Sequence, residues 1–253
     1  MRTIAHIAFA AVLPWAAFAQ SDFNWSGTLS PGQTLEIKGV NGSIHAELAS
    51  GVLIEVSARK TAKRSDPNSV RIEAAPSANG MTICTVYAGD SSDCQSGKRH
   101  HSNTRDNDVS VDYTVRVPAG IHFVPNTVNG RVIATGLRSD VDATAVNGNV
   151  EIATTGLVHA TTVNGSIHAT LGVASWNGSL GFTTVNGSID LTLPPGTNAD
   201  VRATTMSGNL SSDFPMTVND SVGERNMTGR IGSGGRELKL STVNGTVTLH
   251  QGT

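Results

Sequence analysis

Val163-Asn164-Gly165-Ser166-Ile167 is one copy of a five-residue phrase that occurs six times, with small variations, in this chain of 253 residues. Each copy centres on an Asn-Gly pair, and most copies follow one another after 17 to 22 residues. A degenerate copy, Met206-Ser207-Gly208-Asn209-Leu210, precedes the final one. A period near twenty residues is typical of stacked repeats. The pairs are Asn41-Gly42, Asn129-Gly130, Asn147-Gly148, Asn164-Gly165, Asn186-Gly187 and Asn244-Gly245.

The residues around each Asn alternate between apolar and polar. The residue before the Asn and the third residue after it are apolar in every copy, as Val163 and Ile167 are. The second and fourth residues after it are mainly polar, which gives the period of two of a strand with one buried face. A second short strand, such as 157–160, leads into each following phrase. We therefore expect the Val and Ile columns to form the core.

Asn-Gly is also the strongest short hairpin signal, so a sandwich of ordinary hairpins is the alternative. The second strand of each repeat favours a coil instead, with the Asn residues hydrogen-bonded in a ladder at a corner. The sequence predicts an all-β fold, a β-solenoid or β-helix-like stack of two-strand coils of about 17 to 22 residues. In this stack 243–249 would form an end coil, whose open edge invites assembly unless it is capped.

Residues 1–19 have the character of a secretory signal peptide, because an apolar run from Ile4 to Phe18 ends in Ala17-Phe18-Ala19. We expect cleavage after Ala19 and no membrane span in the mature chain. The mature protein is expected to be periplasmic or secreted from a bacterium. Residues 20–125 would form an irregular N-terminal β part, continuous with the Asn-Gly solenoid of residues 126–253.

Two cysteines, Cys84 and Cys94, flank a segment rich in turn formers. In an exported protein this spacing predicts a disulfide that closes a surface loop. A redox-active or metal-binding pair is the alternative, but the CxxC spacing is missing.

The charge balance, 18 Lys and Arg against 20 Asp and Glu with no long block of either sign, gives no support for nucleic-acid binding. Catalytic motifs such as GxSxG, HExxH or a phosphate-binding glycine loop are missing as well. We expect no enzymatic activity and no cofactor.

One column of the predicted coils deserves inspection for chemistry, since the register places His168 between Glu151 and Asp190 on neighbouring coils. Such a histidine could act as an acid and base, or bind a metal with one more ligand. A solvated charge ladder is favoured, because an exposed pair on a flat face has no pocket that excludes water.

A second cluster combines His100 and His101 with Asp106 and Asp108 in a polar link. These side chains suit a divalent metal, but their spacing fits no known loop pattern. We expect an incidental charged loop and no metal.

The chain resembles a family of bacterial exported proteins described as "putative adhesins", domains of unknown function with a Thr-x-Asn-Gly-x-Ile theme. The residues that carry the resemblance are Val115 to Gly120, the Thr-Val-Asn-Gly cores, and Gly232 to Gly235 leading into Leu238 to Gly245. The resemblance implies an all-β repeat fold in the cell envelope or outside the cell, without established catalytic residues.

These observations predict a non-enzymatic, adhesin-like protein that presents a surface to an envelope or extracellular protein or glycan. One alternative is a polysaccharide-active β-helix enzyme, a lyase or hydrolase. Few aromatic residues support it, with Trp176 in a longer repeat either exposed for sugar stacking or part of the core. The other alternative is a periplasmic accessory of an envelope-stress signalling system.

Overall fold

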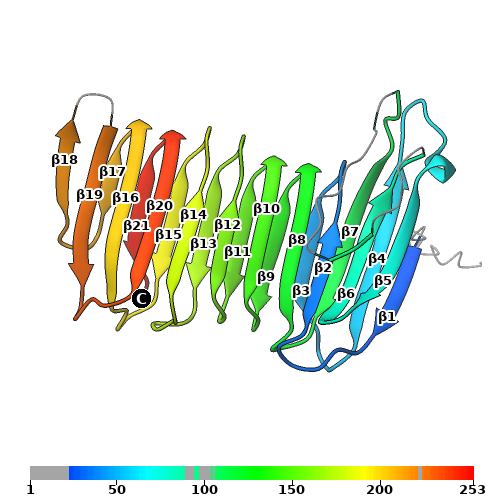
Figure 1. Cartoon of the computed structure of the whole chain (residues 1–253), viewed down its shortest axis with the longest axis horizontal. Helices are drawn as coiled ribbons and strands as arrows, with labels where there is room; N and C mark the ends of the chain where they lie inside the picture. Colours follow the sequence, from blue (N-terminus) through cyan, green and yellow to red (C-terminus); the bar gives the residue numbers. More distant parts are fainter. Residues whose placement is uncertain (1–22, 89–93, 97–103, 105, 222–223) are drawn as a thin grey trace, which may run out of the picture.

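The computed structural model describes residues 23–88, 94–96, 104, 106–221 and 224–253. Within these ranges every regular element is a β-strand, except one short 3-10 helix, η1 (Pro67–Ser69). The strands form two long sheets that lie face to face, as Figure 1 shows. The predicted all-β stack of coils is confirmed, while the predicted signal segment 1–19 lies outside the described residues.

Sheet A contains ten strands and sheet B eleven. In spatial order, sheet A consists of β1 (Phe23–Gly27), β4 (Ile54–Thr61), β7 (Ser110–Val117), β3 (Ile44–Leu48), β9 (Val132–Leu137), β11 (Val150–Thr154), β13 (Ile167–Leu171), β15 (Ile189–Leu193), β21 (Val247–Gln251) and β17 (Leu210–Ser212). Sheet B consists of β18 (Thr217–Ser221), β19 (Glu224–Ile231), β16 (Ala199–Ser207), β20 (Glu237–Asn244), β14 (Ser179–Thr183), β12 (Val158–Thr161), β10 (Val141–Asn147), β8 (His122–Asn129), β2 (Thr34–Lys38), β6 (Gly80–Val86) and β5 (Arg71–Ser77).

One coil consists of a strand in sheet B, the Asn-Gly corner and a strand in sheet A. Neighbouring coils pair in parallel and in register, so that Val150 lies beside Ile167 and Ile152 beside Ala169. Side chains alternate along a strand, so these four fill the space between the sheets, where all are buried. One coil alone cannot bury its apolar face, and the stack supplies the missing neighbour on each side.

Val40 of the first copy is buried, but the valines of the later copies do not lie in the core, contrary to our expectation. Val128 and Val163 are each 37% exposed, and Met206 of the degenerate copy is 61% exposed. The threonine one position earlier, such as Thr127, points inward instead. The chain turns at the Asn-Gly corner, so alternation in the preceding strand, not in the following one, decides where the valine points.

The coils do not stack in the order of the chain. The pair β20 and β21, which carries Asn244, is inserted between the β14–β15 coil and the β16–β17 coil (Figure 1). The degenerate copy therefore forms the end coil, and β18 and β19 extend sheet B beyond it. Our expectation of an open edge at 243–249 is wrong, because these residues have a neighbour on both sides.

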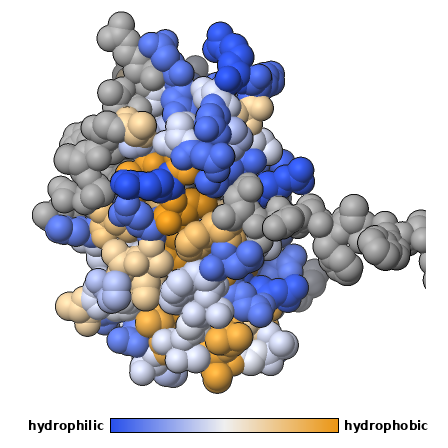
Figure 2. All heavy atoms as spheres, turned by 90° about the vertical axis from the view of Figure 1, so that its right-hand side faces the viewer, coloured by the Kyte–Doolittle hydropathy of each residue, from blue (hydrophilic) through white to orange (hydrophobic). Residues whose placement is uncertain are grey.

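The N-terminal strands extend the same two sheets. Asn41 bridges to Asn129, while β7, β4 and β1 continue sheet A and β6 and β5 continue sheet B. At this end of the molecule, which faces the viewer in Figure 2, apolar surface is visible among hydrophilic side chains. The partly buried Phe23, Trp25 and Ile72 pack against the core from these outer strands.

Candidate functional site

The Asn-Gly corner carries a continuous side-chain ladder. Each asparagine Nδ2 donates to the Oδ1 of the asparagine in the preceding coil, and all five bonds measure 2.8 Å. The ladder runs through Asn41, Asn129, Asn147, Asn164, Asn186 and Asn244. Each of the four inner amides thus uses a donor and an acceptor within the stack, while Asn41 only accepts and Asn244 only donates, which gives the asparagines a structural role.

Two further ladders flank the asparagines. The inward threonine Oγ1 donates to the carbonyl of the phrase glycine in a neighbouring coil, as Thr162 does to Gly148 at 2.9 Å. The residue after the glycine accepts the corresponding backbone N–H, as Ser166 Oγ does from Ser188 N at 3.1 Å. The Thr-x-Asn-Gly-Ser pattern is therefore explained by bonds between coils.

The column that we singled out for inspection does come together in space. Glu151 lies beside His168, and His168 beside Asp190, on the outer face of sheet A. All three side chains face outward, and none of the ion pairs within the described ranges joins His168 to either carboxylate.

A different histidine on this face lies between two carboxylates. His250 Nε2 is 3.6 Å from Asp190 Oδ1, and its Nδ1 is 3.2 Å from Asp213 Oδ2. A backbone hydrogen bond from Gln251, followed by the bond and charge of His250, lowers the pKa of Asp213. We did not anticipate this arrangement, because it depends on the displaced position of β21.

Asp108, one of the metal-ligand candidates, is occupied by the backbone. Its carboxylate accepts hydrogen bonds from the N–H groups of Lys63, Arg64 and Ser65, and these bonds lower its pKa to about 2. Asp106 is the one non-glycine residue of the described ranges with positive φ, at 59°. His100 and His101 lie outside the described residues. No group of three or more potential metal ligands occurs in the part of the chain that the structure describes.

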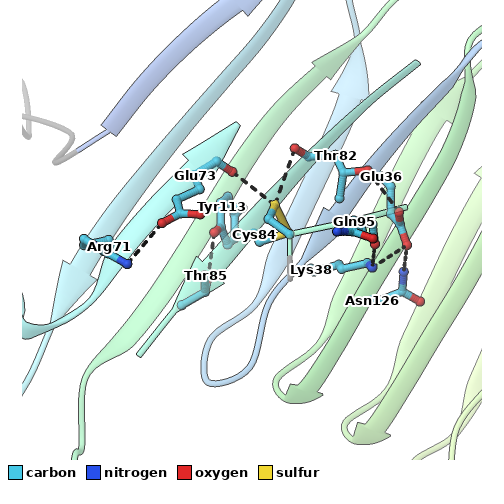
Figure 3. Close-up of a disulfide and its surroundings, with 11 residues drawn as sticks. Glu36, Lys38, Arg71, Glu73, Thr82, Cys84, Thr85, Gln95, Tyr113 and Asn126 are labelled. Carbon is cyan, nitrogen blue, oxygen red and sulfur yellow. Dashed lines mark hydrogen bonds and ion pairs between the residues drawn. A yellow bond between two sulfur atoms is a disulfide. The ribbon is translucent and has the colours of Figure 1, made fainter. Parts of the chain in front are cut away.

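Cys84 and Cys94 form a disulfide, with their Cα atoms 5.6 Å apart. The segment that follows Cys94 covers a buried ion pair on sheet B, as Figure 3 shows. Lys38 Nζ donates to the carbonyl of Gln95 and lies 3.5 Å from Glu36 Oε1. Thr82 Oγ1 also donates to Glu36, at 3.2 Å. Both charges are nearly inaccessible, so the disulfide holds the segment that keeps them from water.

Trp176 belongs to the core. It is 4% exposed, and its Nε1 donates to the carbonyl of Glu237 at 3.3 Å. It is therefore not a sugar-stacking platform.

A further cluster of titratable groups lies on sheet B, at the corner opposite the asparagine ladder. His122 Nε2 is 2.8 Å from Asp142 Oδ2, and its Nδ1 is 3.4 Å from Thr34 Oγ1. His159 lies beside Asp142 in register. With Arg138 and Asp140 at its rim, the cluster lines a cavity of about 380 Å³. We call it the sheet B cleft.

The charges of the sheet B cleft stabilise one another. The hydrogen bond that His122 donates to Asp142 raises the pKa of His122 against the opposing effect of burial, and the charges of Asp142 and Asp140 add to the rise. Burial works against ionisation of Asp142, but the bond from His122 and the charges of His122 and His159 outweigh it and lower its pKa. His122 and Asp142 thus favour an imidazolium–carboxylate pair.

This cleft was not predicted from the sequence. Alternation along the second strands places His122, Asp142 and His159 on the outer face. Asp142 and His159 each precede a phrase asparagine by five residues, so the phrase spacing pairs them in register. The contact of His122 with Asp142 is diagonal between neighbouring strands and does not follow from that register alone.

The fold and its ladders define a two-sheet stack of parallel coils. Residues 126–250 match the model of the family described as Toastrack DUF4097. This match to the repeat region confirms the resemblance found in the sequence. No curated protein matches the chain.

Two solved structures are similar to it. One is a "putative cell adhesion protein" from Clostridium sporogenes, with 10% identity, 91% of this chain and 99% of the other covered, and a TM-score of 0.48. The other is a "putative adhesin" from Bacteroides fragilis, with 10% identity, coverage of 90% and 96%, and a TM-score of 0.25. No helix in the described ranges is long and apolar enough to cross a membrane.

Proposed function

We propose that this protein is an exported, adhesin-like, non-enzymatic binding protein that presents the outer face of sheet A to a protein or glycan of the cell envelope or the extracellular space. The observation that carries the proposal is the continuous register of sheet A. Its ten strands align outward side chains in columns, as in the column of Glu151, His168 and Asp190. At about 4.8 Å per strand, such a face spans roughly 40 Å, which suits a partner that makes many weak contacts.

The regularity of this face supports presentation of a surface over catalysis. Thr170 and Thr192 lie next to the charged column and are also paired in register. A flat array of hydroxyl and charged groups offers hydrogen bonds at a fixed repeat, but it does not surround a reacting atom.

Export is part of the proposal. The disulfide supports it, because disulfides persist in oxidising compartments. The test is fractionation of bacterial cells that express the full chain, followed by N-terminal sequencing. We expect a periplasmic or secreted protein that begins at Gln20; an uncleaved cytoplasmic protein would contradict this.

The binding face is tested with residues 20–253 against envelope fractions, intact cells and immobilised glycans. A Thr170→Arg, Thr192→Arg variant places two bulky cations on sheet A, and its matched control, Thr161→Arg, Thr183→Arg, places them on sheet B. We expect saturable binding that the sheet A pair abolishes and the sheet B pair leaves intact. Equal binding by both variants would contradict the assignment to sheet A.

A second variant, Glu151→Ala, His168→Ala, distinguishes binding from catalysis. Binding that survives this double substitution supports the non-enzymatic function. Conversion of a glycan that the substitution abolishes would favour the polysaccharide-active enzyme instead.

A further inference from the structure

The sheet B cleft is hollow because glycines replace side chains at successive corners. Gly32 and Gly120 have φ angles of 83° and 79°, which disfavour other residues. A Cβ on Gly156 would lie 2.3 Å from the backbone of Ser139. The cavity of about 380 Å³ falls at the lower end of the roughly 300 to 1,000 Å³ of small-molecule sites.

The floor of the cleft is fixed by buried hydrogen bonds. Ser139 Oγ donates to the carbonyl of Pro118 at 3.1 Å, and Thr154 Oγ1 donates to the carbonyl of Ser139. Asp140 Oδ1 accepts the N–H of Leu157 at 2.7 Å. The groups at the rim are therefore held in place before any ligand arrives, which reduces the entropy lost on binding.

Several polar groups of the cleft keep hydrogen-bonding capacity. Within the described ranges, the guanidinium of Arg138 and the ring of His159 have no hydrogen-bond partner. Asp140 and Asp142 each use one carboxylate oxygen in the contacts above and leave the other for a ligand. Leu157 adds a half-buried apolar surface.

The charges at the cleft nearly balance. Arg138 and the His122 imidazolium stand against the carboxylates of Asp140 and Asp142. A strongly anionic ligand would meet two carboxylates, and a cationic ligand would meet an arginine. Hydroxyl groups suit both kinds of partner, because each can donate to a carboxylate and accept from a guanidinium.

We propose that the sheet B cleft binds one unit of a neutral saccharide. Its hydroxyls donate to Asp140 and Asp142 and accept from Arg138 and His159, while its C–H surface contacts Leu157. This site is distinct from the outer face of sheet A, so either binding proposal can be contradicted while the other stands.

The test uses ¹⁵N-labelled residues 20–253 and amide NMR. The probes are methyl β-D-glucopyranoside, methyl β-D-galactopyranoside and methyl α-D-mannopyranoside, with glucuronate and glucosamine as charged comparators. We expect at least one neutral glycoside to shift the amides of Gly32, Gly120 and Gly156 in a saturable way. The absence of saturable shifts with all three glycosides, or tighter binding of glucuronate or glucosamine, would overturn the proposal.

Two variants localise the effect. Arg138→Ala and Asp140→Asn should each weaken binding at least tenfold, with thermal unfolding near that of the parent. Arg131→Ala and Asp190→Asn, which remove similar charges outside the cleft, should bind normally. Parent-like binding of the glycoside by both cleft variants would contradict the site. A sheet A variant that loses its envelope partner but still binds the glycoside would separate the two proposals.

Discussion

At the scale of single residues, almost every position of the repeated phrase makes a bond or contact to the next coil. Threonine donates inward to a glycine carbonyl, asparagine donates along the corner, and serine accepts a backbone N–H. Isoleucine or valine then fills the core, where Ile167 is fully buried. The valine contributes through its backbone, as Val146 O accepts the N–H of Asn164 at 2.7 Å, while its side chain points outward in the later copies.

Glycine is required at the corner mainly by close approach. A Cβ on Gly148 would lie 1.8 Å from the carbonyl oxygen of Gly130 in the neighbouring coil. Gly148→Ala should therefore force the coils apart and lower the free energy of unfolding by about 3 kcal/mol or more, measured by chemical denaturation. Gly181→Ala in β14, where no atom lies within 4 Å, is the control and should change stability by less than about 0.5 kcal/mol. An equally small change in unfolding free energy in both variants would show that the corner accommodates a Cβ.

The serine ladder has a gap at Arg131. Ser43 Oγ accepts the N–H of Arg131, and Asn149 Oδ1 accepts that of Ser166, but Arg131 has no acceptor for Asn149 N. Arg131→Ser should supply it and raise the free energy of unfolding by about 0.5 kcal/mol. Arg131→Ala removes the same charge without adding an acceptor, so an equal gain in that variant would rule out the hydrogen bond as the cause.

The His122–Asp142 pair makes stability depend on pH. The pKa of His122 is raised, so its contribution is complete below about pH 6.5 and is lost as pH rises through the raised value. The pKa of Asp142 is lowered, so its contribution is present above about pH 4 and is lost as pH falls through the lowered value. The difference in melting temperature between the parent and His122→Asn should be largest near pH 5 and shrink by pH 8. A constant difference would mean that the pair does not titrate as a unit.

At the scale of elements, the coil at the end of the stack needs hydrogen-bond donors that inner coils obtain from their neighbours. Inside the stack the phrase glycine carbonyls receive a threonine hydroxyl, except at Gly130, where the neighbouring coil has Ala145 in place of the threonine. Gly208 of the end coil has no further coil beyond it. Arg225 of β19 donates to Gly208 O at 2.7 Å and to Asn209 Oδ1 at 2.9 Å. The guanidinium of the β18–β19 hairpin thus takes the place of the hydrogen-bond donors that a further coil would have supplied.

Arg225→Ala should destabilise this end selectively. Charge-assisted hydrogen bonds contribute about 1.5 to 3 kcal/mol, and partial exposure places the expected loss near the lower figure. Hydrogen exchange should accelerate in β16 to β19 and stay unchanged in β9 to β13. Arg202→Ala, on the outer face of β16, is the matched control. Uniform acceleration along the stack would contradict a local cap.

At the scale of the whole molecule, the order of coils in space differs from their order in the chain. Strands β20 and β21 complete both sheets between coils that precede them in sequence. Deletion of residues 237–253 should leave four strand edges unpaired, and we expect loss of cooperative unfolding together with concentration-dependent association. Deletion of Gly252 and Thr253 alone is the control. A cooperative monomer after the longer deletion would show that the neighbouring coils can close the gap.

The sequence was sufficient to predict the stack, because Asn164 and its counterparts recur with a strand period on either side. It was insufficient for the order of the coils, since the final phrase resembles the others and fits any gap between two of them. The phrase spacing does pair Asp142 with His159 in the sheet B cleft, since each stands five residues before an asparagine, but the diagonal contact of His122 with Asp142 needs the structure. Our expectation that Val163 lies in the core was wrong because the alternation of inward and outward side chains does not continue through the Asn-Gly corner.

The inserted position of β20 and β21 also affects the order in which the coils can fold as the chain emerges. A polypeptide that folds as it emerges, N-terminus first, can assemble the coils from Asn41 to Asn186 one after another. It then holds an open seam, with residues 198–231 waiting beside it, until residue 251 has emerged and the final coil closes the seam. During that interval a folding helper that shields strand edges would have its greatest effect on this protein.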